Sequence, residues 1–239
     1  MRRFSFIVYS LVLLIIQCLS PKPVWSEITV YDMVVLKNQP VMLKAITRGK
    51  MFRRGGIVVS FSVGDRELGQ SLSGGDGVAF KEFRPSQRGH HTIVVQAEDE
   101  KNTGTVLVLN RGEKIVFVDV EGSLLEGIFS KKSRDGGRDA INQLTGKFHV
   151  VFLRTGLLDE NLLKAWLKKN DFPEMPVVAW QKGRIFEELT AKGLKIRAVI
   201  GKAQVIESAR ERAPLTFTFG ESDDAVEVST WEEITKELL

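Results

Sequence analysis

The stretch that most constrains the fold is KIVFVDVEGSLLEG, residues 114–127, a run of β-forming residues that ends in two acids. Four apolar residues, 115–118, are followed by Asp119, and Glu121 comes two positions later, before Gly122 and Ser123. A short apolar run of this kind is typical of a strand buried on both faces. Open α/β sheets bind ligands outside the carboxyl ends of such strands. The sequence therefore predicts an α/β sheet that presents Asp119 at its carboxyl edge.

Downstream of this stretch, helical and strand patterns alternate. The predicted helices are 135–147, 159–169, 192–212 and 231–239, and the predicted strands are 148–153, 176–180 and 215–219. Strands that alternate with helices favour parallel pairing with helices on the faces of the sheet. We therefore expect residues 111–239 to form a three-layer α/β domain, Rossmann-like, with a mainly parallel sheet.

Upstream, residues 27–110 contain short strands separated by turns. The candidates are 28–36, 41–47, 57–63, 78–83, 91–97 and 105–109. Several strands at spacings of about 8–12 residues predict an all-β sandwich. The segment GIVVSFSVGDRELGQSLSGGDGVAFKEFRPSQRGHHTIVVQA, residues 56–97, resembles bacterial immunoglobulin-like domains. The resemblance implies a module for interaction or spacing, with no chemistry of its own.

Residues 1–26 have the pattern of a signal peptide. Arg2 and Arg3 precede an apolar run over residues 4–19, and VWS at 24–26 favours cleavage before Glu27. We expect an exported protein, periplasmic or extracellular, with an uncleaved N-terminal membrane anchor as the alternative. The segment holds three basic residues and no acidic one, so its removal lowers the net charge from +4 to +1. The basic composition is therefore no argument for nucleic-acid binding.

Two features of the β-rich half invite functional interpretations. His90 and His91 are candidate metal ligands, but neighbours in a strand point to opposite faces, so one ion rarely uses both. The basic loop 48–56 could meet anionic lipid or polysaccharide, and a solvated loop is the simpler interpretation.

Three predicted strands end in polar residues at the same edge of the sheet. In chain order these residues are Asp119 and Glu121, then Arg154 and Thr155, then Glu221, Asp223 and Asp224. A lysine between the last two groups, Lys195 or Lys202, completes the set. In this order the parts resemble the haloacid dehalogenase (HAD) superfamily, in particular its lipin and phosphatidate-phosphatase branch. The segments that carry the resemblance are residues 114–127, 148–178, 193–209 and 217–228.

The resemblance implies Mg²⁺-dependent hydrolysis of a phosphate ester. Asp119 would form an aspartyl-phosphate intermediate, Glu121 would serve as acid and base, and Lys195 would neutralise charge. The implied phosphate-binding residues are Ser123, Arg154 and Thr155. The implied magnesium ligands are Asp119, Glu121 through its backbone carbonyl, Asp223 and Asp224. The implied substrate is a phosphorylated molecule, such as a lipid or another large phosphoester of the cell envelope.

Glu121 departs from the family pattern, which has aspartate at this position. The extra methylene moves the carboxyl group by about 1.3–1.5 Å, and a misplacement of about 1 Å costs roughly 100-fold in rate. Two hypotheses stay open: a phosphatase, and a non-catalytic HAD-like protein that binds an envelope or protein partner through its immunoglobulin-like domain. We expect a monomer in either case. A receiver domain, which also combines Asp, Thr and Lys, is disfavoured because Asp119 lies on the first strand of its domain.

Overall fold

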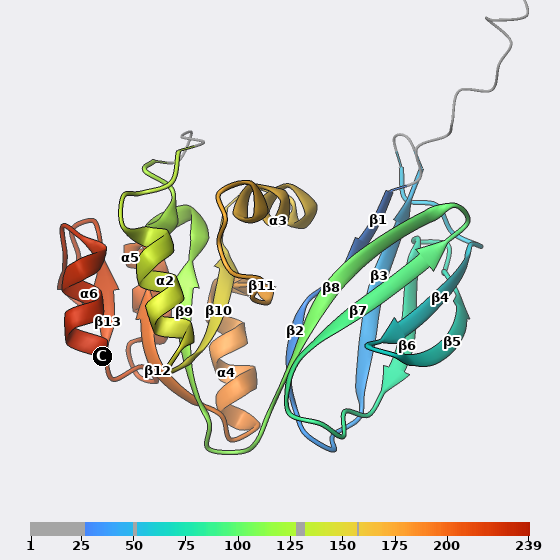
Figure 1. The fold of residues 1–239 in the computed structure, drawn as a ribbon, viewed down its shortest axis with the longest axis horizontal. Coiled ribbons are helices and arrows are strands. Elements are labelled where there is room, and N and C mark those ends of the chain that lie inside the picture. The colour runs from blue at the N-terminus through green and yellow to red at the C-terminus, as the bar shows by residue number, and fades with distance from the viewer. Residues whose placement is uncertain (1–26, 50–51, 128–131, 157) are drawn as a thin grey trace, which may run out of the picture.

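The computed structural model describes residues 27–49, 52–127, 132–156 and 158–239. The predicted signal peptide lies outside these residues, as do positions 50 and 51 of the basic loop. The described chain forms two lobes, a β-sandwich followed by a parallel sheet with helices (Figure 1). No helix among the described residues has the length and apolar character needed to cross a membrane.

The first lobe is a sandwich of two sheets, as predicted. Its strands are β1 (Glu27–Val30), β2 (Met33–Leu36), β3 (Val41–Arg48), β4 (Val58–Val63), β5 (Arg66–Leu72), β6 (Val78–Phe83), β7 (Gly89–Ala97) and β8 (Glu100–Leu109). One sheet has the order β1-β3-β6 and the other β2-β8-β7-β4-β5. The neighbours β8, β7 and β4 correspond to the G, F and C strands of immunoglobulin domains, so the strand order is immunoglobulin-like.

The first strand of the sandwich changes sheet part-way along. β1 pairs antiparallel with β3, whereas β2 pairs parallel with β8 in the other sheet. Asp32 lies at the corner between them and is buried. Inward-facing residues of both sheets, among them Leu43, Val59 and Ile93, fill the core of the sandwich.

The second lobe contains one sheet of six parallel strands. They are β9 (Lys114–Asp119), β10 (His149–Arg154), β11 (Val177–Ala179), β12 (Lys195–Ile200), β13 (Thr216–Thr218) and β14 (Val226–Glu227). The spatial order is β11-β10-β9-β12-β13-β14. The chain builds outward from β9 on one side and then returns to build outward from β12 on the other. The order therefore reverses between β9 and β12, which is where open α/β sheets bind ligands.

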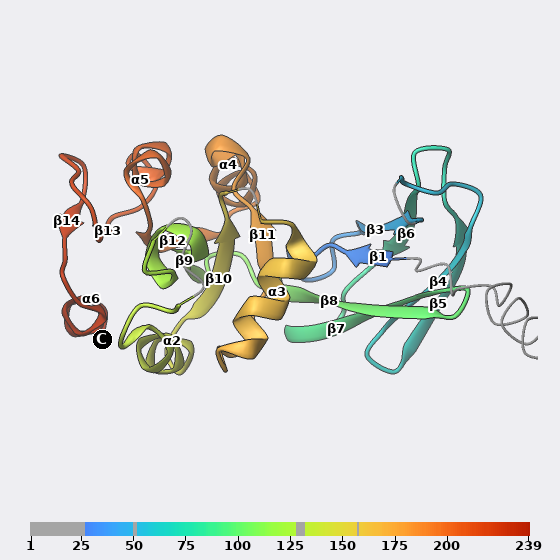
Figure 2. The same ribbon diagram turned by 90° about the horizontal axis from the view of Figure 1, so that it is seen from above.

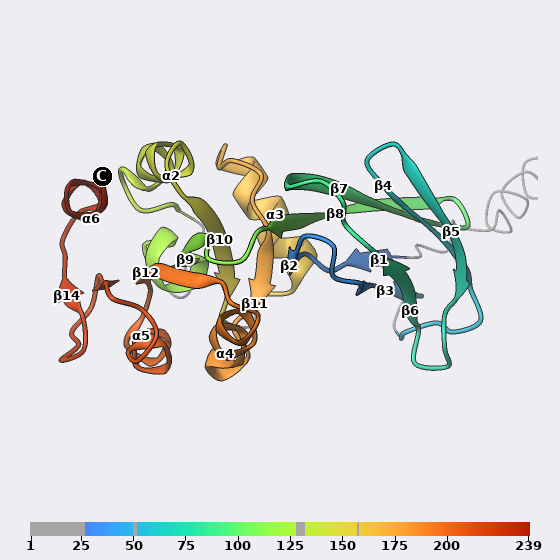
Figure 3. The ribbon, with the colours of Figure 1, turned by 90° about the horizontal axis from the view of Figure 1, so that it is seen from below.

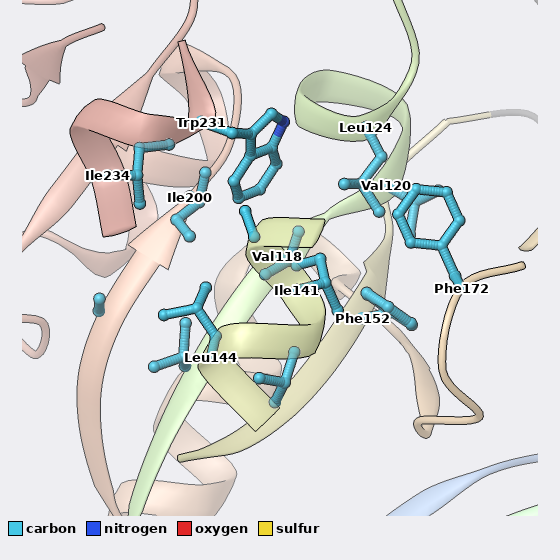
Figure 4. Close-up of a cluster of buried hydrophobic side chains, with 14 of the residues drawn as sticks. Val118, Val120, Leu124, Ile141, Leu144, Phe152, Phe172, Ile200, Trp231 and Ile234 are labelled. Atoms are coloured by element: carbon cyan, nitrogen blue, oxygen red, sulfur yellow. The ribbon is translucent and has the colours of Figure 1, made fainter. Parts of the chain in front are cut away.

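Helices cover both faces of this sheet. They are α2 (Gly137–Thr145), α3 (Glu160–Lys169), α4 (Arg184–Ala191), α5 (Ala203–Ala209) and α6 (Trp231–Leu238), with a short 3₁₀ turn, η2 (Gln181–Gly183), before α4. α2 and α6 lie on one face, and α4 and α5 lie on the other (Figures 2 and 3). On the first face, Trp231 and Ile234 of α6 pack with Ile141 and Leu144 of α2 above the central strands (Figure 4).

The two lobes share an apolar core. Val34 and Leu36 of β2 and Leu107 and Leu109 of β8 belong to the same buried cluster as residues of β9, α4 and α5, including Phe186. The connection between the lobes is only residues 110–113, between the end of β8 and the start of β9. Because apolar side chains from both lobes exclude water from one another, the sandwich and the parallel sheet pack as a unit.

The prediction of one helix over residues 192–212 is wrong. The structure has strand β12 over the first part of that range and the short helix α5 over the second, while α4 was not predicted. Leu194, Ile196 and Ala198 are buried, as are Val199 and Ile200, because β12 lies beside β9 in the middle of the sheet with both faces covered. A short run buried on both faces has no clear period, so its apolar residues fit a helix as well as a strand.

Candidate functional site at the carboxyl edge of the sheet

The candidate site begins where β9 ends. Asp119 is the last residue of β9, and the chain then enters a five-residue π-helical turn, η1 (Val120–Leu124). Leu153 of β10 is in register with Asp119, and Ile200 of β12 is in register with Val118. The residues that follow these two strands, Thr155 and Lys202, therefore flank Asp119 on either side.

Asp119 is fully buried and its carboxylate accepts hydrogen bonds from both flanks. The Thr155 hydroxyl donates to Oδ1 at 2.5 Å, and the Lys202 backbone N–H donates to Oδ2 at 3.4 Å. Burial raises the pKa of Asp119 above its usual value, and the Thr155 hydrogen bond, the Lys202 charge and the backbone N–H groups of Gly122 and Lys202 oppose that rise. The carboxyl group is thus held by donors of its own chain, without access to solvent.

Glu121 is bound by the loop that follows β10. Its Oε2 atom accepts hydrogen bonds from the backbone N–H groups of Thr155 and Gly156, each at 2.6 Å. The Thr155 hydroxyl lies 3.3 Å from the same oxygen, and the Leu158 N–H donates to Oε1 at 3.4 Å. Hydrogen bonds to an ionised acceptor are among the stronger ones in proteins. The side chain of Glu121 therefore occupies a set of amides that would otherwise be available to an anion; we call this set, the N–H groups of Thr155, Gly156 and Leu158, the amide cradle.

Glycines allow this close approach. A Cβ atom at Gly122 would lie 2.3 Å from Asp119 Oδ2, and one at Gly156 would lie 2.5 Å from Glu121 Oε1. At Gly201, after β12, a Cβ would lie 3.0 Å from the Cβ of Asp119. These contacts show that the two carboxylates are enclosed by backbone on several sides.

The two other residues expected to bind phosphate differ in their exposure. Ser123 is fully buried in η1, and its hydroxyl has no hydrogen-bond partner among the described residues. Arg154 is half-buried, and its Nη1 lies 3.5 Å from the Leu158 carbonyl oxygen. Thr155, in contrast, lies between the two carboxylates as described above.

The assignment of Lys195 to the site needs correction. Lys195 begins β12 and is in register with Lys114, the first residue of β9, so it lies at the amino edge of the sheet, opposite Asp119. Lys202, the alternative, follows the carboxyl end of β12 and acts electrostatically on Asp119. The error follows from the wrong helix over 192–212, because the polarity of a strand decides which end carries the site.

The expected magnesium ligands are not brought together. Asp223 and Asp224 lie on the exposed loop between β13 and β14, where Asp224 Oδ1 lies 3.4 Å from Arg210 Nη1 and the Asp224 carbonyl accepts a hydrogen bond from Thr216. Glu221 is exposed on the same loop. In the described parts of the chain no three acidic, histidine or cysteine side chains form a group that could hold a metal ion. The donor set predicted for Mg²⁺ therefore does not fit this geometry.

Several of the residues singled out in the sandwich have partners within the protein. His91 Nε2 lies 3.0 Å from the Gln87 carbonyl oxygen, while burial lowers the pKa of His90. In the basic loop, Arg54 pairs with Glu98 at 3.0 Å and Arg48 pairs with Asp159 at 3.5 Å. The arginines that flank the loop are thus engaged within the protein, the second of them across the two lobes.

The hydrogen bonds that backbone N–H groups donate to the two carboxylates were not predicted from the sequence. Gly122, Gly156 and Leu158 contribute N–H groups, and none of these has a side chain that signals chemistry. Glycines directly after a polar strand end are the signal that was present, since they let other groups approach the backbone closely.

Comparisons with known proteins give matches to solved structures alone. No protein-family model matches the chain, and no curated protein matches it. Among solved structures, the fibronectin(III)-like modules of Clostridium thermocellum CbhA are 17% identical with a TM-score of 0.27, over 35% of this chain and 98% of theirs.

Two other matches are to surface proteins. Domains 4 and 5 of the S-layer protein SbsC are 18% identical with a TM-score of 0.27, over 35% of this chain and 52% of that one. The D0-D1 domain of intimin is 10% identical with a TM-score of 0.32, over 38% and 56%. The match thus spans about half of these last two structures. At such identities and TM-scores the matches carry no argument about function, and the immunoglobulin-like assignment rests on the strand order.

Proposed function

We propose that this chain is an exported, non-catalytic binding protein, whose α/β lobe is laid out like a HAD-type phosphatase but has a closed carboxyl edge. The observation that carries the proposal is the position of Glu121. Its carboxylate fills the amide cradle, and the acid beside it, Asp119, is fully buried. A nucleophilic carboxylate has to reach the atom that it attacks, and an anionic substrate needs donors that are not already taken.

The surrounding residues support the same proposal. A magnesium-dependent reaction would need oxygen ligands that converge on one point, whereas Asp223 and Asp224 lie on a loop of their own. The apolar run in residues 4–19 supports export, and the strand order of the sandwich supports a role in contact or spacing.

The sandwich offers an apolar surface for a partner. Val58 and Leu72 pair across β4 and β5 and are 52% and 64% exposed. Two large apolar side chains side by side at the edge of a sheet, one on the edge strand β5 and one on its neighbour β4, are the kind of feature that a protein partner covers.

A second candidate function is phosphate-ester hydrolysis. It is favoured by the convergence of Asp119, Thr155 and Lys202 at the point where the strand order reverses. This candidate requires the side chain of Glu121 to leave the amide cradle and Asp119 to become accessible.

Hydrolysis of an aryl phosphate, with and without Mg²⁺, separates the two functions. We expect the wild-type protein to give no turnover above that of Asp119→Asn. Glu121→Asp is the informative companion, because its carboxyl is withdrawn from the cradle by about 1.3–1.5 Å. Turnover by wild type that disappears in Asp119→Asn would sink the non-catalytic proposal. Turnover by Glu121→Asp alone would identify the glutamate as the block on an otherwise competent site.

A further inference from the structure

A cluster of three charged side chains, two buried carboxyl groups and the partly exposed Lys164, joins the two lobes. Asp32 comes from the sheet-changing corner of the sandwich, and Glu160 and Lys164 come from the first turns of α3. Lys164 Nζ lies 2.6 Å from Asp32 Oδ1 and 3.2 Å from Glu160 Oε1. One ammonium group thus serves two carboxyl groups that belong to different lobes.

Backbone groups complete the cluster. The Asp32 carboxylate accepts hydrogen bonds from Thr105 N–H at 2.7 Å and from Val177 N–H at 2.8 Å, the latter on β11 of the other lobe. The Asp32 N–H donates to Glu160 Oε1 at 3.2 Å, and Lys164 also donates to the Val30 carbonyl at 2.9 Å. Asp32 is therefore bound on both sides of the boundary between the lobes.

The cluster carries an excess negative charge when both acids are ionised, because Lys164 supplies the single positive charge. Asp32 and Lys164 lie on the wall of a cleft of about 720 Å³ between β8 and α3. Other charged side chains that line this cleft are Glu27, Glu100, Lys101, Lys168, Asp171 and Glu174. Two carboxyl groups that share one partner in a buried site bind a proton more readily than either would alone.

We propose that Asp32, Glu160 and Lys164 form a proton-linked latch, which holds the sandwich and the α/β lobe together more firmly at mildly acidic than at neutral pH. The bound proton neutralises the excess charge and leaves every hydrogen bond to backbone in place. Glu160 is the better site for it, since Asp32 has more donors around its carboxylate. This latch is independent of the proposed function, because its hydrogen bonds and ion pairs do not involve the side chains of Asp119, Glu121 or Thr155.

Burial is the largest cause of the pKa shifts that support this latch. It raises the pKa of both Asp32 and Glu160; Lys164 opposes the rise in each, and the charge of Asp32 adds to it in Glu160. A carboxyl with a higher pKa in the folded state binds its proton more tightly when folded. Its stabilising effect is full below the unfolded pKa and is lost as the pH rises through the folded pKa.

The test compares wild type with Glu160→Gln, which has the shape of the protonated acid at every pH. Glu82→Gln, at an exposed position of β6, is the matched control. We expect the melting temperature of Glu160→Gln to exceed that of wild type by about 2–4 °C at pH 8, and the difference to shrink as the pH is lowered toward 4.5, the ordinary pKa of a glutamate. Asp119 and His90 also titrate, but they do so in every variant and cancel from the difference. A difference that does not change with pH, or a Glu160→Gln protein that is less stable at pH 8, would overturn the latch.

A distance measurement separates a latch from a contact that affects stability alone. Cys18 is the only cysteine in the sequence, so spin labels can be placed at Gln70→Cys on β5 and Glu188→Cys on α4 in a Cys18→Ser background. We expect the distribution of distances between the lobes to broaden from pH 5 to pH 8 in wild type and to stay narrow in Glu160→Gln. Equal widths at both pH values in wild type would refute the proposal.

Discussion

At the scale of single residues, the hydroxyl of Thr155 links the two acids of the candidate site. It donates to Asp119 at 2.5 Å and lies 3.3 Å from Glu121. In the proposed closed state this hydroxyl has a structural role, because it satisfies a fully buried carboxylate that has few other donors. Its loss would leave an acceptor buried without a partner, and this costs more than the net value of a typical hydrogen bond.

Replacing Thr155 with valine tests that role. We expect Thr155→Val to lower the free energy of unfolding by about 1–3 kcal/mol at neutral pH, measured by denaturant titration. The loss should shrink on acidification, because a protonated Asp119 needs its donors less. Thr92→Val, at an exposed position of β7, is the control and should change stability little. Equal effects of the two substitutions would show that the Thr155 hydroxyl does not support Asp119.

The sequence was informative about Asp119 and Thr155 and misleading about Glu121. Both of the former follow apolar strands, and neighbouring parallel strands bring their ends together, so their meeting could be expected. The orientation of Glu121 depends on the π-helical turn and on which amides are within reach, and neither has a signature in the side chains. The resemblance implies Lys195 with Lys202 as the alternative, and strand β12, which the sequence pattern does not reveal, places only Lys202 at the carboxyl edge.

At the scale of elements, η1 determines how β9 presents its acids. The five-residue turn brings the backbone back past the end of its own strand, so that the Gly122 N–H reaches the Asp119 carboxylate. Insertions of this type in the hydrogen-bonding pattern are frequent at functional sites. The turn is compatible with the neighbouring end of β12 only because Gly122 has no side chain, since a Cβ there would lie 2.9 Å from the Lys202 nitrogen.

Two glycines of this region form a matched pair for mutation. Gly122→Ala should lower the free energy of unfolding by about 1–3 kcal/mol, as expected for an overpacked site. Gly127→Ala should be neutral or slightly stabilising, because a Cβ at Gly127 meets no atom of the described residues within 4 Å. Thermal unfolding of both variants measures the difference. A Gly122→Ala protein as stable as Gly127→Ala would mean that η1 and the end of β12 are less closely packed than described.

The helices and strands of the α/β lobe were predictable where the periodicity of their apolar residues was clear. The helix over 159–169 begins at Asp159, whose side chain accepts hydrogen bonds from the N–H groups of Asn161 and Leu162, as an N-cap does. β12 was not predictable in the same way, because its run is buried on both faces and follows α4 after a short turn. Tertiary packing between β9 and β13 decides its conformation, and that information lies in other parts of the chain.

At the scale of the whole molecule, the two lobes share one apolar cluster and several polar contacts. Leu107 of β8 is fully buried in that cluster, on the side of the sandwich that meets α4. The latch of Asp32, Glu160 and Lys164 lies on the same boundary, as does the Arg48–Asp159 pair. The sequence predicted two separate domains. It contained no sign that the outer face of β2 and β8 packs against the α/β lobe.

Unfolding of the two lobes should therefore be coupled. We expect wild type to unfold in one calorimetric transition and Leu107→Ala to lose about 2–5 kcal/mol of stability, with the transition separating into two. Leu43→Ala, which removes the same side chain from the interior of the sandwich, should destabilise the protein without this separation. Two transitions in wild type would contradict the shared core.

The central claim is that the Glu121 carboxylate fills the amide cradle and so closes the carboxyl edge to anions. The most direct measurement is an NMR titration of the Thr155 and Gly156 amide signals with inorganic phosphate in the presence of Mg²⁺. We predict that both signals stay unchanged in wild type at millimolar phosphate, and that both shift with phosphate in Glu121→Ala, which has no carboxylate to occupy the cradle. Saturable shifts of these two amides with phosphate at neutral pH would contradict the account, because they would show a cradle that is open to ligand.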